Sequence, residues 1–116
     1  MEVLYLTEAD VRQLLTMETA LAAVEDALRH WAEGKSVSQP RTRLHAPGGV
    51  VLHYMAAGDY ACGYFGMKLY TSTPTGTRFL VPLFRADSGE LVALLEADWL
   101  GCLRTGAATG IATKYM

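Results

Sequence analysis

The spacing of apolar residues changes along this chain from a helical to a strand repeat, and this change constrains the fold most. Up to Gly34, apolar side chains recur every three or four residues, which is typical of an amphipathic helix. The clearest run is Met17, Leu21, Val24, Leu28 and Trp31. From Pro40 onward the repeat is two residues, interrupted by Gly, Pro and Asp, which predicts strands joined by turns. The sequence therefore predicts helices first and a sheet after them.

Two helices near the N-terminus are predicted from their capping residues. Thr7 and Asp10 have the spacing of a capping box, in which the two residues satisfy each other's backbone N–H groups. Thr16 is a second N-cap, and Gly34 is a suitable stop. We expect a short helix that ends near Leu15 and a longer one after it that packs on the sheet.

The sheet is predicted to be mainly antiparallel, with about five to six strands. The expected strands cover residues 3–6, 41–45, 50–57, 64–72, 78–86 and 90–97. Pro82 predicts an edge position or a bulge for its strand, because proline has no N–H to donate to a ladder. The last strand is apolar on both faces, so we expect it to lie inside the sheet. The predicted fold class is α+β, with N-terminal helices packed on the sheet.

The chain closes with a predicted helix that is rich in small residues. Asp98 is a suitable N-cap, and one side of the helix carries Gly101, Thr105, Ala108 and Ala112. Gly106 and Gly110 lie in the same helix, and each costs about 1 kcal/mol relative to alanine. A helix with glycine at these positions allows a neighbouring element to pack closely against its backbone. We expect it to lead to a further part of the protein.

Composition and charge exclude several classes of protein. Hydrophobic residues make up 51% of the chain, which excludes a disordered one. A net charge of −2 and singly spread cations predict no binding to nucleic acid or to a membrane. Cys62 and Cys102 lack the spacing of a redox or zinc motif, which favours a reducing compartment, the cytoplasm. His30 and His45 have no ligand spacing with each other or with an acid, so we expect no metal site.

Three cations on separate elements are candidates for ligand binding. Arg41 lies at the start of a predicted strand, Lys68 in the middle of another, and Arg104 in the closing helix. Each lies beside glycines or small side chains, so a ligand has room to approach. Taken singly, each is more often an ordinary surface residue. Taken together, converging cations of this kind bind a carboxylate, which arginine can hold bidentately.

Several segments of the chain resemble the N-terminal domain of the ornithine cyclodeaminase/mu-crystallin family. The segments are residues 6–11 (Leu-Thr-Glu-Ala-Asp-Val), residues 39–42 (Gln-Pro-Arg-Thr), the glycine-containing segment that ends at Lys68, and residues 104–108 (Arg-Thr-Gly-Ala-Ala). The last is the most specific, and the resemblance extends over nearly all of residues 1–116. It implies a substrate-binding and dimerisation domain that forms homodimers through its sheet.

The resemblance also implies the chemistry. Members of the family are NAD- or NADP-dependent enzymes that act on small amino or imino acids by oxidative deamination, cyclisation or ketimine reduction. Arg41, Lys68 and Arg104 would hold the substrate carboxylate, Lys68 would also serve in proton transfer, and Thr105 would face the cofactor. The Gly-x-Gly-x-x-Gly fingerprint of a nucleotide-binding domain does not occur in residues 1–116. We therefore expect the NAD(P)-binding domain to be absent from this chain and the chain alone to be inactive.

Two residues depart from the family pattern and bear on the substrate. Ala56 stands where relatives commonly carry proline, and His53 lies near the acid of ornithine-cyclising members. Ornithine is therefore disfavoured as the substrate. His53 is either an acid/base group or a locally hydrogen-bonded histidine. The alternative functions are a non-catalytic, self-associating module that binds small carboxylates and a purely structural dimer.

Overall fold

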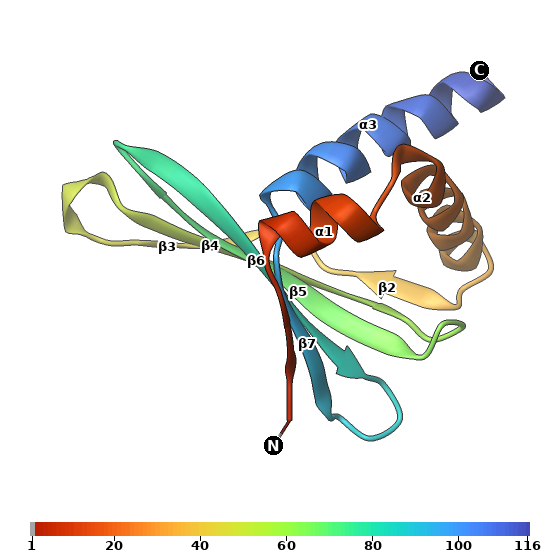
Figure 1. Cartoon of the computed structure of the whole chain (residues 1–116), viewed down its shortest axis with the longest axis horizontal. Helices are drawn as coiled ribbons and strands as arrows, with labels where there is room; N and C mark the ends of the chain where they lie inside the picture. Colours follow the sequence, from red (N-terminus) through yellow and green to blue (C-terminus); the bar gives the residue numbers. More distant parts are fainter. Residues whose placement is uncertain (1) are drawn as a thin grey trace.

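The computed structural model describes residues 2–116, which form one sheet with three helices (Figure 1). The helices are α1 (Glu8–Leu14), α2 (Met17–Ala32) and α3 (Asp98–Tyr115), and a short 3₁₀ turn, η1, spans Pro47–Gly49. The strands are β1 (Leu4–Leu6), β2 (Ser36–Ser38), β3 (Thr42–His45), β4 (Val51–Asp59), β5 (Tyr64–Thr73), β6 (Gly76–Arg85) and β7 (Leu91–Glu96). The predicted α+β class is confirmed.

The sheet has seven strands in the order β1-β7-β6-β5-β4-β2, with β3 also paired to β4. All pairs are antiparallel except β1 with β7. The strand count exceeds the prediction because β2, only three residues long, gives no alternating pattern. The last strand, β7, lies inside the sheet as predicted, between β1 and β6.

Pro82 lies on an inner strand, so the edge alternative is wrong and the bulge alternative is confirmed. Strand β6 pairs with β5 on one side and β7 on the other. Its register to β7 shifts between Leu83 and Phe84, directly after the proline. Since Pro82 cannot donate to a neighbouring strand, an irregular ladder at this point is its physical consequence.

The longer helix, α2, packs mainly along α3 rather than on the sheet, which corrects the prediction (Figure 1). The buried side chains Ala20, Leu103 and Ala107 form the centre of this contact. A Cβ at Gly106 would lie 3.1 Å from Cε of Met17. At Gly110 it would lie only 2.9 Å from Cδ2 of Leu21, so these glycines let the two helices approach closely. The element that packs against Gly106 and Gly110 is therefore α2.

The predicted stripe of small residues lies largely on the other side of α3. Thr105 and Ala112 are exposed, and nothing lies within 4 Å of a Cβ built at Gly101. The α3 residues that are buried are Leu103, Ala107 and Ile111. One side of α3 thus packs against the rest of the chain, and the side with the small residues is largely exposed.

Helix N-termini are capped as predicted in α1 and α2 but not in α3. Thr7 and Asp10 form the capping box, and Thr16 caps α2. Asp98 is not the N-cap of α3, which is Ala97 and has no side-chain cap. Instead the carboxylate of Glu8 accepts hydrogen bonds from the N–H groups of Asp98, at 2.7 Å, and Trp99, at 3.1 Å. The first helix therefore caps the last one.

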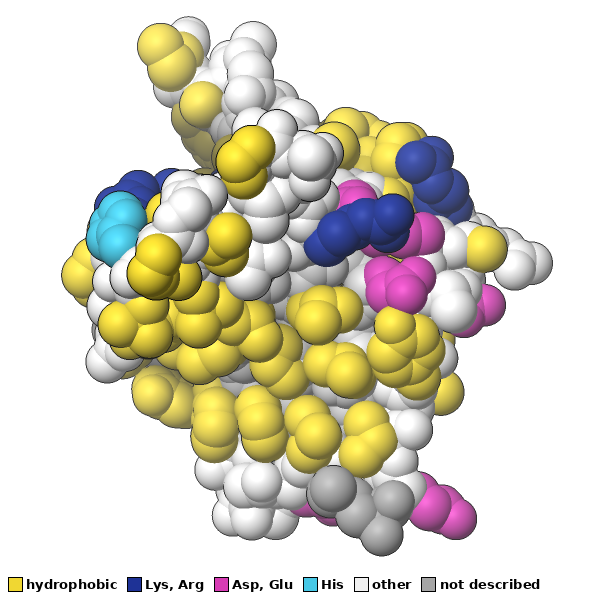
Figure 2. Space-filling model, turned by 90° about the vertical axis from the view of Figure 1, so that its left-hand side faces the viewer, with side chains coloured by type: hydrophobic (Ala, Val, Ile, Leu, Met, Phe, Trp, Pro, Cys, Tyr) yellow, Lys and Arg dark blue, Asp and Glu magenta, His cyan; other side chains and the backbone are white. Residues whose placement is uncertain are grey.

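The two faces of the sheet differ in what covers them. All three helices lie on one side (Figure 1). On the other side, cross-strand rows such as Tyr54–Leu69–Leu80 are apolar and only partly buried. Figure 2 shows hydrophobic side chains gathered over much of the face in view, with a group of charged side chains in its upper right part. No helix within residues 2–116 is long and apolar enough to cross a membrane.

Replacing glycine in α3 should have an effect that depends on which side the glycine faces. We expect Gly101→Ala to raise the free energy of unfolding by up to about 1 kcal/mol, because alanine favours the helix and its Cβ meets no atom. Gly110→Ala places a methyl group against Leu21. This variant should raise the free energy of unfolding by less than Gly101→Ala does, or should lower it. Urea unfolding measures both. Equal changes at the two positions would contradict this account of the α2–α3 contact.

Candidate functional site

A row of three rings crosses the helix-covered side of the sheet. The strand register pairs His53 with Tyr70 and Tyr70 with Phe79, so their side chains lie on the same face. His53 and Tyr70 stack with ring centroids 4.4 Å apart and an interplanar angle of 5°. Tyr70 and Phe79 lie 4.6 Å apart, tilted by 46°. This row forms an aromatic floor across β4, β5 and β6.

Two of the three candidate cations lie over this floor. Nζ of Lys68 is 4.6 Å from the centroid of Phe79 and 5.4 Å from that of Tyr70. Cζ of Arg41, just before β3, lies 5.8 Å from the centroid of Tyr70. These are cation–π distances, which hold a positive group without neutralising it. Lys68 is partly buried here rather than an ordinary exposed lysine.

The third cation, Arg104, reaches the same place from α3. Burial is the main cause that lowers the pKa of Lys68, and the positive charges of Arg104 and Arg41 lower it further. The structure therefore brings both Arg41 and Arg104 within electrostatic range of Lys68. An anionic ligand placed between them would relieve this repulsion.

The start of α3 is fixed to the aromatic floor, which positions Arg104. The N–H of Phe79 donates to Oδ1 of Asp98 at 3.0 Å. The carbonyl of Phe79 accepts from the N–H of Ala97 at 2.9 Å. Thr105, the predicted cofactor-facing residue, is exposed on α3 and donates its hydroxyl to the carbonyl of Gly101 at 2.9 Å.

The ring of His53 has one nitrogen with a hydrogen-bond partner and one without. Its Nε2 lies 2.9 Å from Oγ of Ser72, while its Nδ1 is buried without a hydrogen-bond partner. Burial, and then the charges of Arg43, Arg41 and His45, lower the pKa of His53. The groups that shift this pKa include no carboxylate. Both alternatives for His53 remain compatible with this position, since it has a local hydrogen bond and a free ring nitrogen.

Two surface hollows lie apart from the cation cluster. One, of about 270 Å³, lies along β2, β4 and β5, and Val37, Tyr60 and Phe65 are among its lining residues. The other, of about 210 Å³, lies beside the start of α3, with Glu8 and Arg78 in its wall. Neither is lined by any of the three cations. The case for a ligand at the cluster therefore rests on its charge, not on an enclosed cavity.

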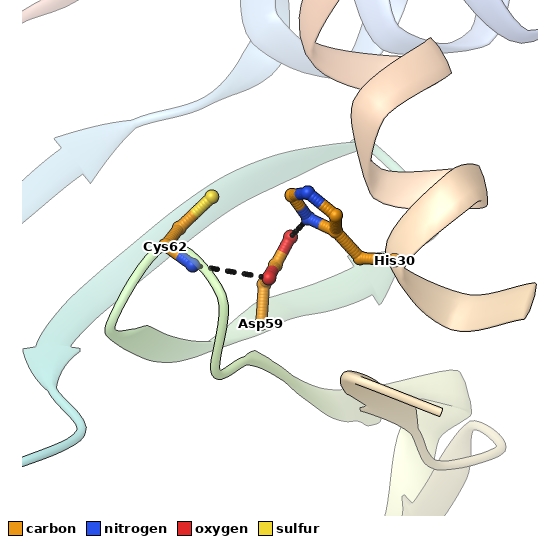
Figure 3. Close-up of side chains that lie close together, drawn as sticks. All are labelled: His30, Asp59 and Cys62. Atoms are coloured by element: carbon orange, nitrogen blue, oxygen red, sulfur yellow. Dashed lines mark hydrogen bonds and ion pairs between the residues drawn. The ribbon is translucent and has the colours of Figure 1, made fainter. Parts of the chain in front are cut away.

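A second cluster of reactive side chains was not foreseen from the sequence. Nδ1 of His30, in the last turns of α2, lies 2.7 Å from Oδ2 of Asp59, at the end of β4. Cys62, in the following turn, is close to both (Figure 3). His30 has no acid at ligand spacing in the sequence, but the fold places Asp59 beside it. The pairing spans 29 residues of sequence, and a search for close ligand spacing does not detect it.

Removing one cation should change the titration of another. Arg104→Ala should raise the pKa of Lys68 toward that of a free lysine, because a nearby positive charge disfavours protonation. The value should stay somewhat lowered, since burial is the larger cause. NMR titration of the labelled lysine side chain measures this. Arg85→Ala, near Tyr64, is the matched control and should change nothing. An unchanged Lys68 pKa in the Arg104 variant would show that the two side chains do not converge.

Comparison with known proteins places the chain in a family. Residues 1–116 match the ornithine cyclodeaminase/mu-crystallin family. The chain is 37% identical to an alanine dehydrogenase of Archaeoglobus fulgidus over its full length, and it spans 37% of that protein. It is 27% identical over 97% of its length to a Δ1-pyrroline-2-carboxylate reductase of Bacillus cereus, again spanning 37% of the relative.

Solved structures agree with this placement. An archaeal alanine dehydrogenase dimer with bound NAD matches all of the chain with a TM-score of 0.90 and 36% identity. A Δ1-pyrroline-2-carboxylate reductase of Thermococcus litoralis, in complex with NADH and L-proline, matches 98% of it with a TM-score of 0.90 and 25% identity. In both cases the chain covers 38% of the solved chain. NAD(H) is thus a cofactor among the relatives, and the chain belongs to the ornithine cyclodeaminase/mu-crystallin family.

Proposed function

We propose that this chain is the substrate-binding and dimerisation part of an NAD- or NADP-dependent enzyme that acts on a small amino or imino acid. The observation that carries the proposal is that Arg41 and Lys68 lie over an aromatic floor and that the charges of Arg41 and Arg104 both act on Lys68. The relatives support it, because they include an alanine dehydrogenase and a reductase complex with NADH and L-proline. The chain covers little more than a third of these proteins, so the activity is proposed for a whole enzyme that contains it.

The cations hold the substrate carboxylate. Arg41 and Arg104 are suited to bidentate hydrogen bonds, while Lys68 contributes a compact charge between them. A fixed carboxylate orients the α-carbon of the substrate, which is what the reaction requires of this domain. When bound, NAD or NADP exchanges a hydride with that carbon. Thr105, on the open side of α3, is the residue of this chain that we assign to contact with the cofactor.

Lys68 is also the group that we assign to proton transfer. Its pKa is lowered mainly by burial, which brings it toward the range in which a lysine can exchange protons with an amine or imine nitrogen. Its position above Phe79 and Tyr70 limits the directions in which the ammonium group can move. A bound carboxylate favours its charged form again, so substrate binding and protonation of Lys68 are coupled.

The surroundings of His53 favour a substrate without a distal ammonium group. The groups whose charges lower its pKa are Arg43, Arg41 and His45. These groups would repel the charged side-chain amine of ornithine. We therefore propose a small substrate without a charged side chain, such as alanine or a cyclic imino acid. The buried, free Nδ1 of His53 is available to a polar group of such a substrate.

The apolar side of the sheet is the surface that we assign to dimerisation. Side chains such as Tyr54, Leu69 and Leu80 form an unbroken row there, and no helix covers it in Figure 1. Apolar patches of this kind mark interaction surfaces, and a two-fold dimer is the commonest way to bury one. The alanine dehydrogenase relative is a dimer. The free cysteines Cys62 and Cys102 suit the cytoplasm, where we expect the enzyme to act.

Binding of a small carboxylate tests the proposed site directly. We expect pyruvate to bind the chain, and Arg104→Ala to weaken binding by at least about tenfold, because a hydrogen bond to a charged group contributes about 1.5–3 kcal/mol. Calorimetric titration measures the affinity. Arg85→Ala is the control and should bind like the unchanged protein. Equal affinity in the Arg104 variant would contradict the clamp. Binding without any activity of the complete enzyme would favour a non-catalytic carboxylate-binding module.

Dimerisation is tested by placing a charge on the apolar side of the sheet. Leu69→Glu should convert a dimer into a monomer in sedimentation at micromolar concentration, because burying an unpaired carboxylate in the interface is costly. Leu28→Glu, on the exposed side of α2, is the control and should leave the dimer intact. Circular dichroism checks that both variants fold. A monomeric unchanged chain, or a dimeric, folded Leu69 variant, would contradict the assignment.

A further inference from the structure

The cluster of His30, Asp59 and Cys62 has the composition of a transition-metal site. Its three ligand atoms, an imidazole nitrogen, a carboxylate oxygen and a sulfur, all lie within 4.8 Å of one another. They come from the end of α2, the end of β4 and the turn before β5, and they point toward a common space (Figure 3). We propose that these three side chains bind a zinc ion that fastens α2 to the β4–β5 hairpin.

The backbone already holds two of the ligands in place. Oδ1 of Asp59 accepts the N–H groups of Ala61, at 3.1 Å, and Cys62, at 3.2 Å. These bonds fix the carboxylate and close the turn that carries the cysteine. Oδ2 lies within hydrogen-bond distance of Nδ1 of His30. The thiol of Cys62 also hydrogen-bonds to this carboxylate, and burial and this bond raise the pKa of the thiol, so a metal ion would have to replace the thiol proton. The site therefore needs little reorganisation of the main chain.

The distances allow a metal ion to replace the hydrogen bond between His30 and Asp59. Nδ1 and Oδ2 are now 2.7 Å apart. In a tetrahedral zinc site, with metal–ligand bonds of about 2.0–2.2 Å, the two atoms would be about 3.3 Å apart. The required widening is about 0.6 Å, within reach of small side-chain rotations. Cys62 is exposed, and its sulfur can approach the ion by rotation about the Cα–Cβ bond.

The donor set favours zinc over the other common ions. A thiolate and an imidazole disfavour magnesium and calcium, which prefer oxygen ligands. Three protein ligands leave one position for water on the exposed side. The side chains of His30 and Asp59 are 19% and 23% exposed, so the ion has a path from solvent.

The site is separate from the cation cluster and serves a different purpose. Asp59 lies four residues beyond Met55, which pairs with Lys68, so the two sites are about 13 Å apart along β4. A zinc ion here would join the C-terminal turns of α2 to the sheet. Apart from β2, which follows it, α2 has few other contacts with the sheet, because it packs mainly on α3. The expected effect is to stabilise this contact, and it does not depend on the proposed enzymatic function.

Cobalt substitution tests the site, because Co²⁺ bound to a thiolate gives a charge-transfer absorption band. We expect the 116-residue chain to show this band on addition of Co²⁺ and to lose it on addition of Zn²⁺. Cys62→Ser should abolish the band, and His30→Ala should weaken Co²⁺ binding by at least about tenfold. The matched controls are Cys102→Ser, at the other free cysteine, and His45→Ala, at an exposed histidine on β3. Both should retain the band.

Thermal unfolding gives a second readout. Zn²⁺ should raise the Tm of the unchanged chain and of Cys102→Ser, since an ion that binds only the folded state stabilises it, but not that of Cys62→Ser. Serine is close to cysteine in size and Cys62 is exposed, so this variant should fold. Absence of the cobalt band in the unchanged chain, its persistence in Cys62→Ser, or its loss in Cys102→Ser would each overturn the proposal. In those cases His30 and Asp59 form only a hydrogen-bonded contact.

Discussion

The register of the antiparallel strands β4, β5 and β6 is the constraint on which the rest of the structure depends. It aligns His53, Tyr70 and Phe79 in one row beneath Lys68, and it places Tyr54, Leu69 and Leu80 on the opposite side. A slip of one residue would exchange the two faces. The lysine would then lie on the apolar surface and the aromatic floor would be lost. The proposed ligand binding and the proposed self-association thus depend on the same set of backbone hydrogen bonds.

A network of carboxylates then fixes the closing helix to this sheet. Glu8 caps α3, Asp98 accepts from the backbone of Phe79, and Glu96 accepts from the N–H of Glu8 at 2.8 Å. The first and last helices are therefore held at the same end of the sheet. Arg104 reaches Lys68 only because α3 begins at this place. The distribution of charge agrees with this, since Glu8 and Asp98 lie at the start of α3, while Arg41 and Lys68 lie over the aromatic floor.

The sequence predicts the features that depend on neighbours along the chain. The capping box of Thr7 and Asp10, the strand periods and the α+β class are local signals, and the structure has all three. The contacts that the sequence does not predict join residues far apart along the chain. Nothing local distinguishes Glu8 as the cap of a helix 90 residues later, or pairs His30 with Asp59. The packing of α2 on α3 depends in the same way on Gly106 and Gly110, which only the folded chain places opposite Met17 and Leu21.

The central claim is that Arg41, Lys68 and Arg104 hold one carboxylate above the aromatic floor. A crystal structure of the chain with pyruvate tests this claim most directly. The account predicts a carboxylate within hydrogen-bond distance of all three cations, with the rest of the ligand on the open side of α3. A carboxylate bound elsewhere, or held by only one of the three side chains, would contradict it.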